Sequence, residues 1–183
     1  MKRKTIKTLD SRVAEIVWMT VCLLLISSAA NAQDIADFSG KWDLNKLKSS
    51  SLPASITSSS ITISQEKKYA LTLDISVTSG DSKPFKKTEN YFLNSSVEIK
   101  KVNQDDKSIR IDCTALPDGH SFSVTETTSL VENGTTKNYI RVSVYSLSID
   151  GKTLIIKTDD TQPEGSPASE NEMHEKRVYD KSV

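Results

Sequence analysis

Apolar and polar residues alternate along most of the chain beyond residue 38. The clearest stretch runs from Leu71 to Val77, where every second residue is aliphatic and the residues between are Thr72, Asp74 and Ser76. Successive side chains of a strand point to opposite faces, so this spacing places the aliphatic side chains together on one face. The same period predicts about ten strands, over 38–44, 59–66, 71–78, 85–93, 97–102, 109–114, 121–125, 138–149, 152–158 and 174–181.

The connections between these strands are mostly short, which favours antiparallel neighbours. Asp150-Gly151 is predicted to be a two-residue turn, because Asp and Gly tolerate the positive φ angles that such turns need. Slightly longer loops are expected at 103–106 and 132–136, and a further break at 79–84. The pattern predicts an all-β fold, a single antiparallel up-and-down β-barrel of about 8–10 strands, because closure removes exposed edges. A two-layer sandwich is the alternative.

Two connections are longer and more polar than the others. The stretch 46–58 is rich in serine, and 159–172 contains two prolines and a glycine. Such sequences lack the apolar residues that would pack them against a core. We therefore predict that both stretches form mobile rims of the barrel.

The first 32 residues have the pattern of a removable leader. A basic head precedes an apolar run from Ile16 to Ile26, and Ala30-Asn31-Ala32 has the small residues that a signal peptidase accepts. We expect a signal peptide over 1–32 and a barrel domain over 33–183. A membrane anchor is the alternative, but a spanning helix needs about 20 apolar residues. No membrane span is expected after cleavage.

Removal of the leader changes the charge balance of the chain. The leader carries five basic and two acidic residues of the 24 of each sign, which leaves 19 basic and 22 acidic residues. The charges are scattered, so the sequence lacks the basic stripe that nucleic acid requires, and we expect no nucleic-acid partner. Cys113 is the only cysteine outside the leader. An intrachain disulfide is therefore excluded for the mature chain.

Residues that could support catalysis are few. His120 follows Asp118-Gly119 in a predicted turn, and His174 precedes the last strand. Neither belongs to a metal-binding spacing such as His-x-His, and no serine stands in Gly-x-Ser-x-Gly. The sequence thus predicts no enzymatic activity, no metal and no cofactor.

The two ends of the predicted domain carry short motifs. Phe38-Ser39-Gly40-Lys41-Trp42 resembles the Gly-x-Trp signature at the first strand of lipocalins and fatty-acid-binding proteins, which form the calycin superfamily. Arg177-Val178-Tyr179 resembles the closing strand of fatty-acid-binding proteins. With 148–154, these motifs most resemble small exported lipocalin-like proteins of Gram-negative bacteria. This resemblance implies export to the periplasm or the medium.

The resemblance also implies roles for these residues. In the superfamily the tryptophan plugs one barrel end and a basic residue of the last strand lies across its indole. This implies a plug of Gly40, Trp42 and Arg177, with a cation–π contact of about 0.5–2 kcal/mol. In fatty-acid-binding proteins the Arg-x-Tyr pair instead grips a ligand carboxylate. Arg177 can hardly do both, and we assign it to the plug. The sequence departs from fatty-acid-binding proteins at one point. Those proteins have a helical lid after the first strand, whereas 46–58 is too short and too rich in serine to form one.

The residues that contact a ligand depend on the pairing of two strands. If Val131 faces Lys137, then Glu126 points inward on the same face as Val142 and Val144, whereas Arg141 and Tyr145 point outward. An inward carboxylate needs a partner, so Glu126 is a candidate polar anchor. A bulge would turn it outward, and a one-residue slip would reverse every assignment. The predicted ligand contacts are Phe122, Val124, Glu126, Val142 and Tyr179.

Two functions remain open from the sequence. The first is an exported barrel that binds or carries a small hydrophobic ligand, such as a lipid, in its lumen. The second is a periplasmic or surface protein with a packed barrel that binds a protein partner through 46–58 and 159–172. An outer-membrane barrel is disfavoured, because the strands lack its lipid-facing apolar band and aromatic girdles. A lumen of about 300 Å³ or more, lined by apolar residues, would favour the first.

Overall fold

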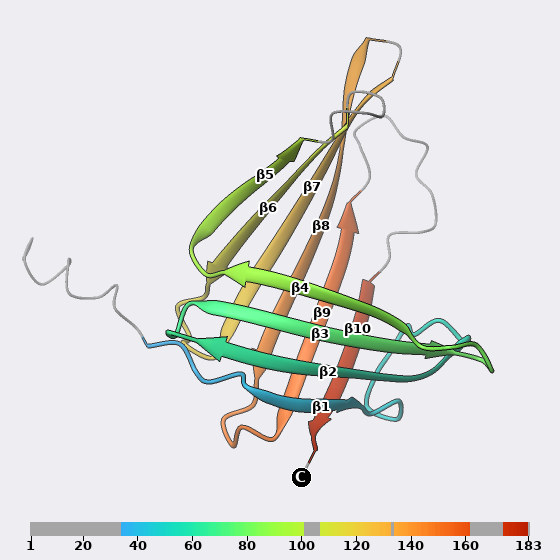
Figure 1. The fold of residues 1–183 in the computed structure, drawn as a ribbon, viewed down its shortest axis with the longest axis vertical. Helices are drawn as coiled ribbons and strands as arrows, with labels where there is room; N and C mark the ends of the chain where they lie inside the picture. Colours follow the sequence, from blue (N-terminus) through green and yellow to red (C-terminus); the bar gives the residue numbers. More distant parts are fainter. Residues whose placement is uncertain (1–33, 101–106, 133, 162–173, 183) are drawn as a thin grey trace, which may run out of the picture. The chain divides into compact units, whose positions relative to one another are not determined.

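Ten antiparallel strands form one sheet that rolls into a nearly closed barrel (Figure 1). The computed structural model describes residues 34–100, 107–132, 134–161 and 174–182, so the predicted leader lies outside the described residues. The strands are β1 (Gly40–Leu44), β2 (Ile56–Glu66), β3 (Ala70–Ser79), β4 (Phe85–Phe92), β5 (Ser95–Lys100), β6 (Ser108–Ala115), β7 (Ser121–Glu132), β8 (Thr135–Leu147), β9 (Thr153–Thr161) and β10 (His174–Lys181). The predicted all-β up-and-down barrel is confirmed.

Each strand pairs with its neighbour in sequence, except that β4 and β5 do not pair. The first and last strands, β1 and β10, pair with each other, with Trp42 opposite Lys181 and Leu44 opposite Tyr179. The strands β4 and β5 do not pair, so they form the two edges of the sheet. β1 to β4 cross steeply over the strands from β7 to β10 (Figure 1). The ends of the domain therefore meet side by side, as the two terminal motifs imply.

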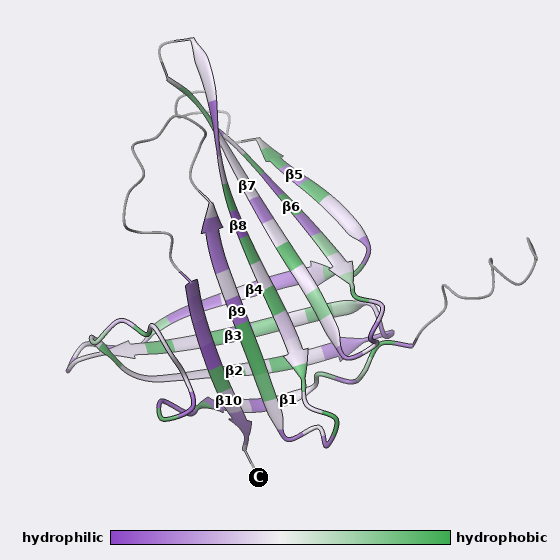
Figure 2. Ribbon diagram, turned by 180° about the vertical axis from the view of Figure 1, so that it is seen from behind, coloured by the Kyte–Doolittle hydropathy of each residue, from purple (hydrophilic) through white to green (hydrophobic). Residues whose placement is uncertain are grey.

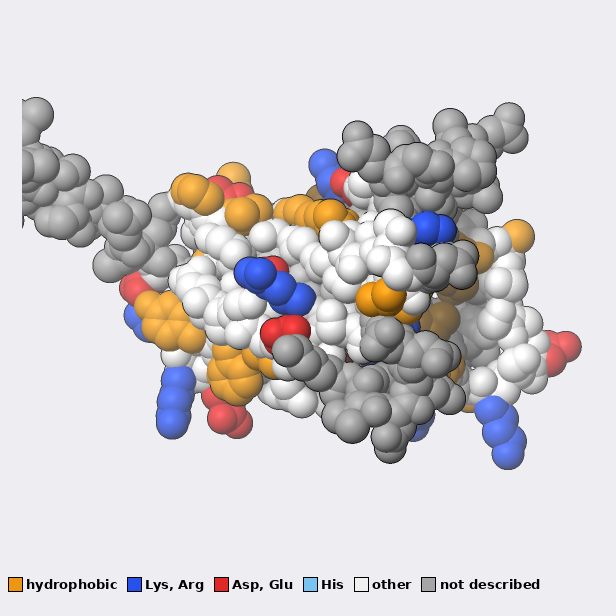
Figure 3. All heavy atoms as spheres, turned by 90° about the horizontal axis from the view of Figure 1, so that it is seen from above, with side chains coloured by type: hydrophobic (Ala, Val, Ile, Leu, Met, Phe, Trp, Pro, Cys, Tyr) orange, Lys and Arg blue, Asp and Glu red, His pale blue; other side chains and the backbone are white. Residues whose placement is uncertain are grey.

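The two unpaired edges carry exposed apolar side chains. Phe85 and Phe92 of β4 and Val97 and Ile99 of β5 are each about half exposed or more. Seen from above, the exposed charged side chains of both signs lie in small separate groups, among polar and apolar side chains (Figure 3). The described residues contain no helix long and apolar enough to cross a membrane.

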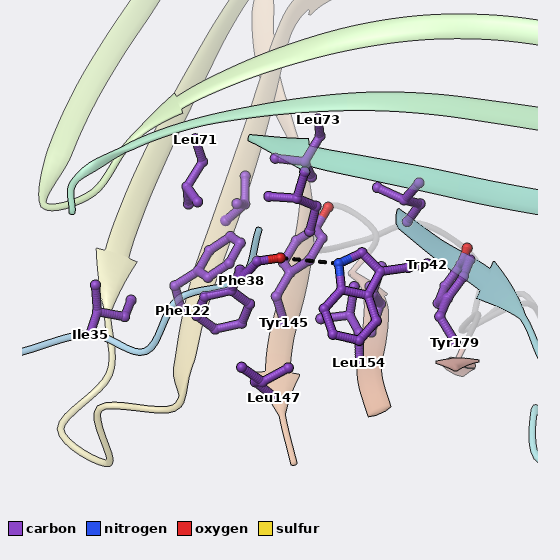
Figure 4. Close-up of a cluster of buried hydrophobic side chains, with 14 of the residues drawn as sticks. Ile35, Phe38, Trp42, Leu71, Leu73, Phe122, Tyr145, Leu147, Leu154 and Tyr179 are labelled. Atoms are coloured by element: carbon purple, nitrogen blue, oxygen red, sulfur yellow. Dashed lines mark hydrogen bonds between the residues drawn. The ribbon is translucent and has the colours of Figure 1, made fainter. Parts of the chain in front are cut away.

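Alternation along the strands gives the barrel an apolar inner surface at one end. Green bands of apolar residues recur along the strands in Figure 2. Phe38 and Phe122 meet edge to face with centroids 5.0 Å apart, and Phe122 stacks on Tyr145 at 4.6 Å. Such offset or perpendicular ring pairs add to the stabilisation that burial provides. The cluster also includes Ile35, Trp42, Leu71, Leu73, Leu147 and Leu154, and it fills this end of the barrel (Figure 4).

The residues in front of β1 help to close the packed end. The Ala36 amide donates to the Gly119 carbonyl at 2.7 Å, and the Phe38 amide donates to Oε1 of Gln65 at 2.9 Å. The indole N–H of Trp42 donates to the Phe38 carbonyl at 3.0 Å, inside the cluster (Figure 4). The first strand thus begins at Gly40, two residues later than predicted, because Phe38 is used for packing.

Two hairpin connections differ from the prediction. The link between β8 and β9 is not a two-residue turn: the Gly151 amide donates to the Ser148 carbonyl, and Gly151 but not Asp150 has a positive φ. The link between β7 and β8 is only two residues long, at 133–134, where a loop over 132–136 was predicted. The predicted loop at 103–106 lies outside the described residues.

The serine-rich connection after β1 is not a free rim. The Ser50 amide donates to the Lys176 carbonyl at 2.8 Å, and the Val178 amide donates to Oγ of Ser49 at 2.9 Å. This connection covers the outer side of β10, where Val178 is only 3% exposed. β2 starts at Ile56, inside the predicted loop. In the other predicted rim, 159–161 belong to β9 and 162–172 lie outside the described residues.

Candidate ligand-binding cavity

A cavity of about 320 Å³ occupies the lumen beyond the packed end. Its apolar lining comes from Ile61, Ile75, Val124 and Ile156, and three tyrosines, Tyr91, Tyr145 and Tyr179, border it. Six charged residues also line it: Lys87, Glu89, Glu126, Arg141, Glu175 and Arg177. The volume therefore meets the value expected of a ligand carrier, but the lining is amphipathic instead of apolar.

The motif of the last strand lies on the cavity wall. Nε and Nη2 of Arg177 donate to the two carboxylate oxygens of Glu175, at 2.8 and 2.9 Å. The hydroxyl of Tyr179, on the same wall, lies 3.4 Å from Oγ of Ser59. Burial lowers the pKa of Arg177, but the bond to Glu175 and the nearby Glu175 and Tyr179 side chains outweigh burial, so the pKa is raised overall. The guanidinium is thus charged and held by the protein itself.

A second polar chain lines the wall at β4. Nζ of Lys87 lies 2.5 Å from Oε1 of Glu89, and the Tyr91 hydroxyl donates to Oε2 of Glu89 at 2.8 Å. Tyr145 borders the cavity beside this chain, and its nearby phenol affects the pKa of Tyr91. Burial, followed by the nearby Tyr145 and Glu89, raises the pKa of Tyr91, and burial also raises that of Tyr145. Both phenols therefore stay neutral and act as hydrogen-bonding groups.

Glu126 lies opposite Arg141 on the cavity wall. Arg141 donates through Nε and Nη2 to the two oxygens of Asp160, at 2.7 and 2.9 Å. This bond, opposed by burial and aided by the charges of Asp160 and Glu126, raises the pKa of Arg141. Glu126 itself forms no hydrogen bond or ion pair with another described residue. It also borders a neighbouring hollow of about 260 Å³, which Tyr139 and Asp160 line.

The predicted pairing of β7 and β8 is wrong by one residue. Leu130, not Val131, stands opposite Lys137, because the strands are joined by two residues only. Arg141 and Tyr145 therefore face the cavity, contrary to the prediction. Val142, a predicted ligand contact, lies on the opposite face of β8. Glu126 faces inward as predicted, because its own strand alternates with Phe122 and Val124.

The other predicted ligand contacts lie at different depths. Val124 and Tyr179 line the cavity together with Glu126. Phe122 does not, because it is fully buried between Phe38 and Tyr145 in the packed end. Whether any of these residues contacts a ligand stays a prediction.

The assignment of Arg177 to the Trp42 indole is also wrong. The ammonium of Lys181 occupies that position, 5.1 Å from the centroid of the indole ring. The register explains this, since Lys181 is the residue of β10 directly opposite Trp42. Gly40 has φ 140°, and a Cβ there would lie 2.7 Å from Cε of Lys181. Gly40 therefore combines an unusual backbone conformation with room for the lysine.

Sequence reasoning missed several residues that build the site. In β10, Glu175, Arg177, Tyr179 and Lys181 are spaced two residues apart and therefore lie on one face. This spacing could have revealed Glu175 and Lys181. Glu89 and Tyr91 also follow this period along β4. Ser59 gave no signal, because a serine suits either face.

The remaining candidate residues are not among those that line the cavity. Cys113 is a free, buried thiol, and burial raises its pKa to about 11. His120 is exposed in its turn, and His174 pairs at 2.6 Å with Asp159 on the outer surface. Across the described ranges, no group of three His, Cys, Asp or Glu side chains could hold a metal ion.

Comparison with known proteins gives similarities of structure only. No family model matches the sequence, and no curated protein matches it. Among solved structures, wild-type fluorescent protein UnaG shares 11% identity over 79% of this chain and 97% of its own, with a TM-score of 0.48. A point mutant of UnaG shares 11% identity over 80% of this chain and 96% of its own, with a TM-score of 0.49. The barrel assignment itself rests on the strand order and registers above.

Proposed function

We propose that this chain is an exported lipocalin-like barrel that holds a small, partly apolar molecule in its lumen. The observation that carries the proposal is the division of the barrel into a packed end and a hollow end. The packed cluster around Trp42 supplies stability, whereas the cavity of about 320 Å³ leaves space that the protein's own side chains do not fill. Cavities of this size are typical of small-ligand sites.

The chemistry of the lining supports a ligand with two kinds of surface. Ile61, Ile75 and Ile156 can bury an apolar body, and each buried methylene contributes about 0.8 kcal/mol. The charged and phenolic groups of the same wall can fix a polar end. A purely hydrophobic ligand would displace water from these groups without offering them a hydrogen bond in return, at a cost in affinity.

Export is proposed from the leader pattern over 1–32, with the periplasm or the medium of a Gram-negative bacterium as the destination. The alternative function, a packed barrel that binds a protein partner through its loops, needs a lumen filled by side chains. The hollow end argues against that alternative.

A matched pair of variants tests the proposal. Ser143 lines the cavity, whereas Ser123 lies on the outer face of the adjacent strand. The neutral dye N-phenyl-1-naphthylamine should fluoresce strongly with the mature protein, because the apolar part of the cavity wall shields it from water. Ser143→Phe should abolish this signal, and Ser123→Phe should keep it. An equal signal from both variants, or none from the unmodified protein, would contradict a ligand-binding lumen.

A further inference from the structure

Among the residues that the structure describes, the charged groups of the lumen are paired with one exception. Lys87 pairs with Glu89, Arg177 with Glu175, and Arg141 with Asp160. Every cation of the wall thus has its own carboxylate. Glu126 is the carboxylate left over, and the sum of these charges is one negative unit.

The arginine that the sequence motif would offer to a ligand carboxylate is already occupied. Glu175 takes two donors of Arg177 in a bidentate pair, and its side chain is only 6% exposed. Such fork-to-fork pairs are among the strongest hydrogen-bonded pairs in proteins. A ligand carboxylate would have to displace Glu175 and would then leave that carboxylate buried without a partner. The second arginine, Arg141, is held in the same way by Asp160.

Unlike the two arginines, Glu126 is not bound by an oppositely charged side chain among the described residues. It borders both the main cavity and the smaller hollow that contains Tyr139, so its carboxylate lies where the two spaces meet. Arg141, which stands opposite Glu126 on β8, acts on it through its charge but directs its hydrogen bonds to Asp160. A carboxylate in such surroundings gains most from a cationic hydrogen-bond donor, and the ring of Tyr139 can add a cation–π contact.

We infer that the lumen selects a molecule with an apolar body and a protonated amine, which Glu126 binds. This inference rests on the proposed ligand-binding function and names the class of ligand. It differs from the fatty-acid carboxylate that the closing-strand resemblance implies, because the two arginines are neutralised within the protein.

Three ligands with the same alkyl chain test the inference: decylamine, decanol and decanoate. Titration calorimetry of the mature protein at neutral pH should give at least tenfold tighter binding for decylamine than for decanoate, with decanol between them. Glu126→Gln should weaken decylamine at least fivefold and leave decanol unchanged. Glu66→Gln removes an exposed carboxylate of β2 and serves as the control, with no change for any of the three.

The outcomes separate the inference from the function on which it rests. Decanoate binding as tightly as decylamine, or an amine preference that survives Glu126→Gln, would overturn the inference and leave the ligand-binding function standing. Failure of all three to bind would remove the proposed function itself. If Glu126→Gln does not fold, Glu126→Asp can replace it: this variant keeps the charge and must keep the preference for decylamine. The ratio of decylamine to decanoate affinity is measured on the unmodified protein and depends on no variant.

Discussion

The ammonium of Lys181 lies 5.1 Å from the centre of the Trp42 indole, and the two residues face each other where the first and last strands pair. This contact joins the two ends of the barrel domain over its packed end. The cation is exposed, so the contact is worth about 0.5–1 kcal/mol rather than the larger value of a desolvated pair.

Replacement of Lys181 should therefore destabilise the barrel modestly. Lys181→Met keeps the aliphatic stem but removes the charge, and we expect a loss of about 0.5–1 kcal/mol in the free energy of unfolding. Lys86→Met, at an exposed position of β4, is the control and should have little effect. Urea denaturation followed by Trp42 fluorescence measures both. An equal effect of the two substitutions would show that the indole contact contributes nothing.

Gly40 should be sensitive for two separable reasons. Gly40→Ala forces a backbone with φ 140° on a residue with a side chain, at a cost of about 1–3 kcal/mol. The new Cβ would also collide with the flexible end of Lys181. Since that end can move, the Gly40→Ala, Lys181→Ala double variant should remain less stable than Lys181→Ala alone by most of this loss. Equal stability of the double variant and Lys181→Ala would instead assign the cost to the collision.

The pair between Arg177 and Glu175 leads to a prediction about ligand selectivity. Glu175→Gln removes the carboxylate that occupies Arg177, so the guanidinium becomes available to a ligand anion. Decanoate should then bind more tightly to the variant than to the unmodified protein, whereas decanol should change little. Calorimetric titration measures both, and an unchanged or weaker decanoate affinity would show that Arg177 is not the anion site.

Asp180 should contribute to stability in a pH-dependent manner. The hydrogen bond from Asn45 and the bond from Lys48 lower the pKa of Asp180. A carboxyl whose pKa is lower in the folded state stabilises it above the unfolded pKa of about 3.9, and this contribution is lost as the pH falls through the folded value. Between about pH 5 and pH 2, the unmodified protein should thus lose more stability than Asp180→Asn. Denaturation at several pH values checks this, and parallel curves would contradict it.

The strands were predictable because the inner surface of the barrel is apolar at its packed end. Leu71 and Leu73 alternate with polar residues, and any such run shows which face is buried. The cavity was not predictable in the same way, because at its wall the apolar side chains are not the inward ones. Arg141 and Ser143 of β8 point inward, whereas Val142 lies on the outer face. Hydrophobicity alone therefore favours the wrong register of β8.

One overlooked signal could have corrected the register. The Asn-Gly dipeptide at 133–134 is the strongest short hairpin signal, and a two-residue connection there sets Glu132 opposite Thr135. The choice between Arg177 and Lys181 for the indole needs the register of β1 with β10. That register depends on a contact between opposite ends of the chain, and neither strand carries a turn that fixes it.

Native mass spectrometry of the mature protein purified from its own host shows directly whether the hollow end of the barrel holds a small molecule. We expect a population heavier than the bare chain by the mass of one small molecule, which organic solvent releases. We further expect that Ser143→Phe, which fills the cavity, loses this added mass while Ser123→Phe retains it. Bare chain alone in every preparation would contradict a ligand-binding lumen.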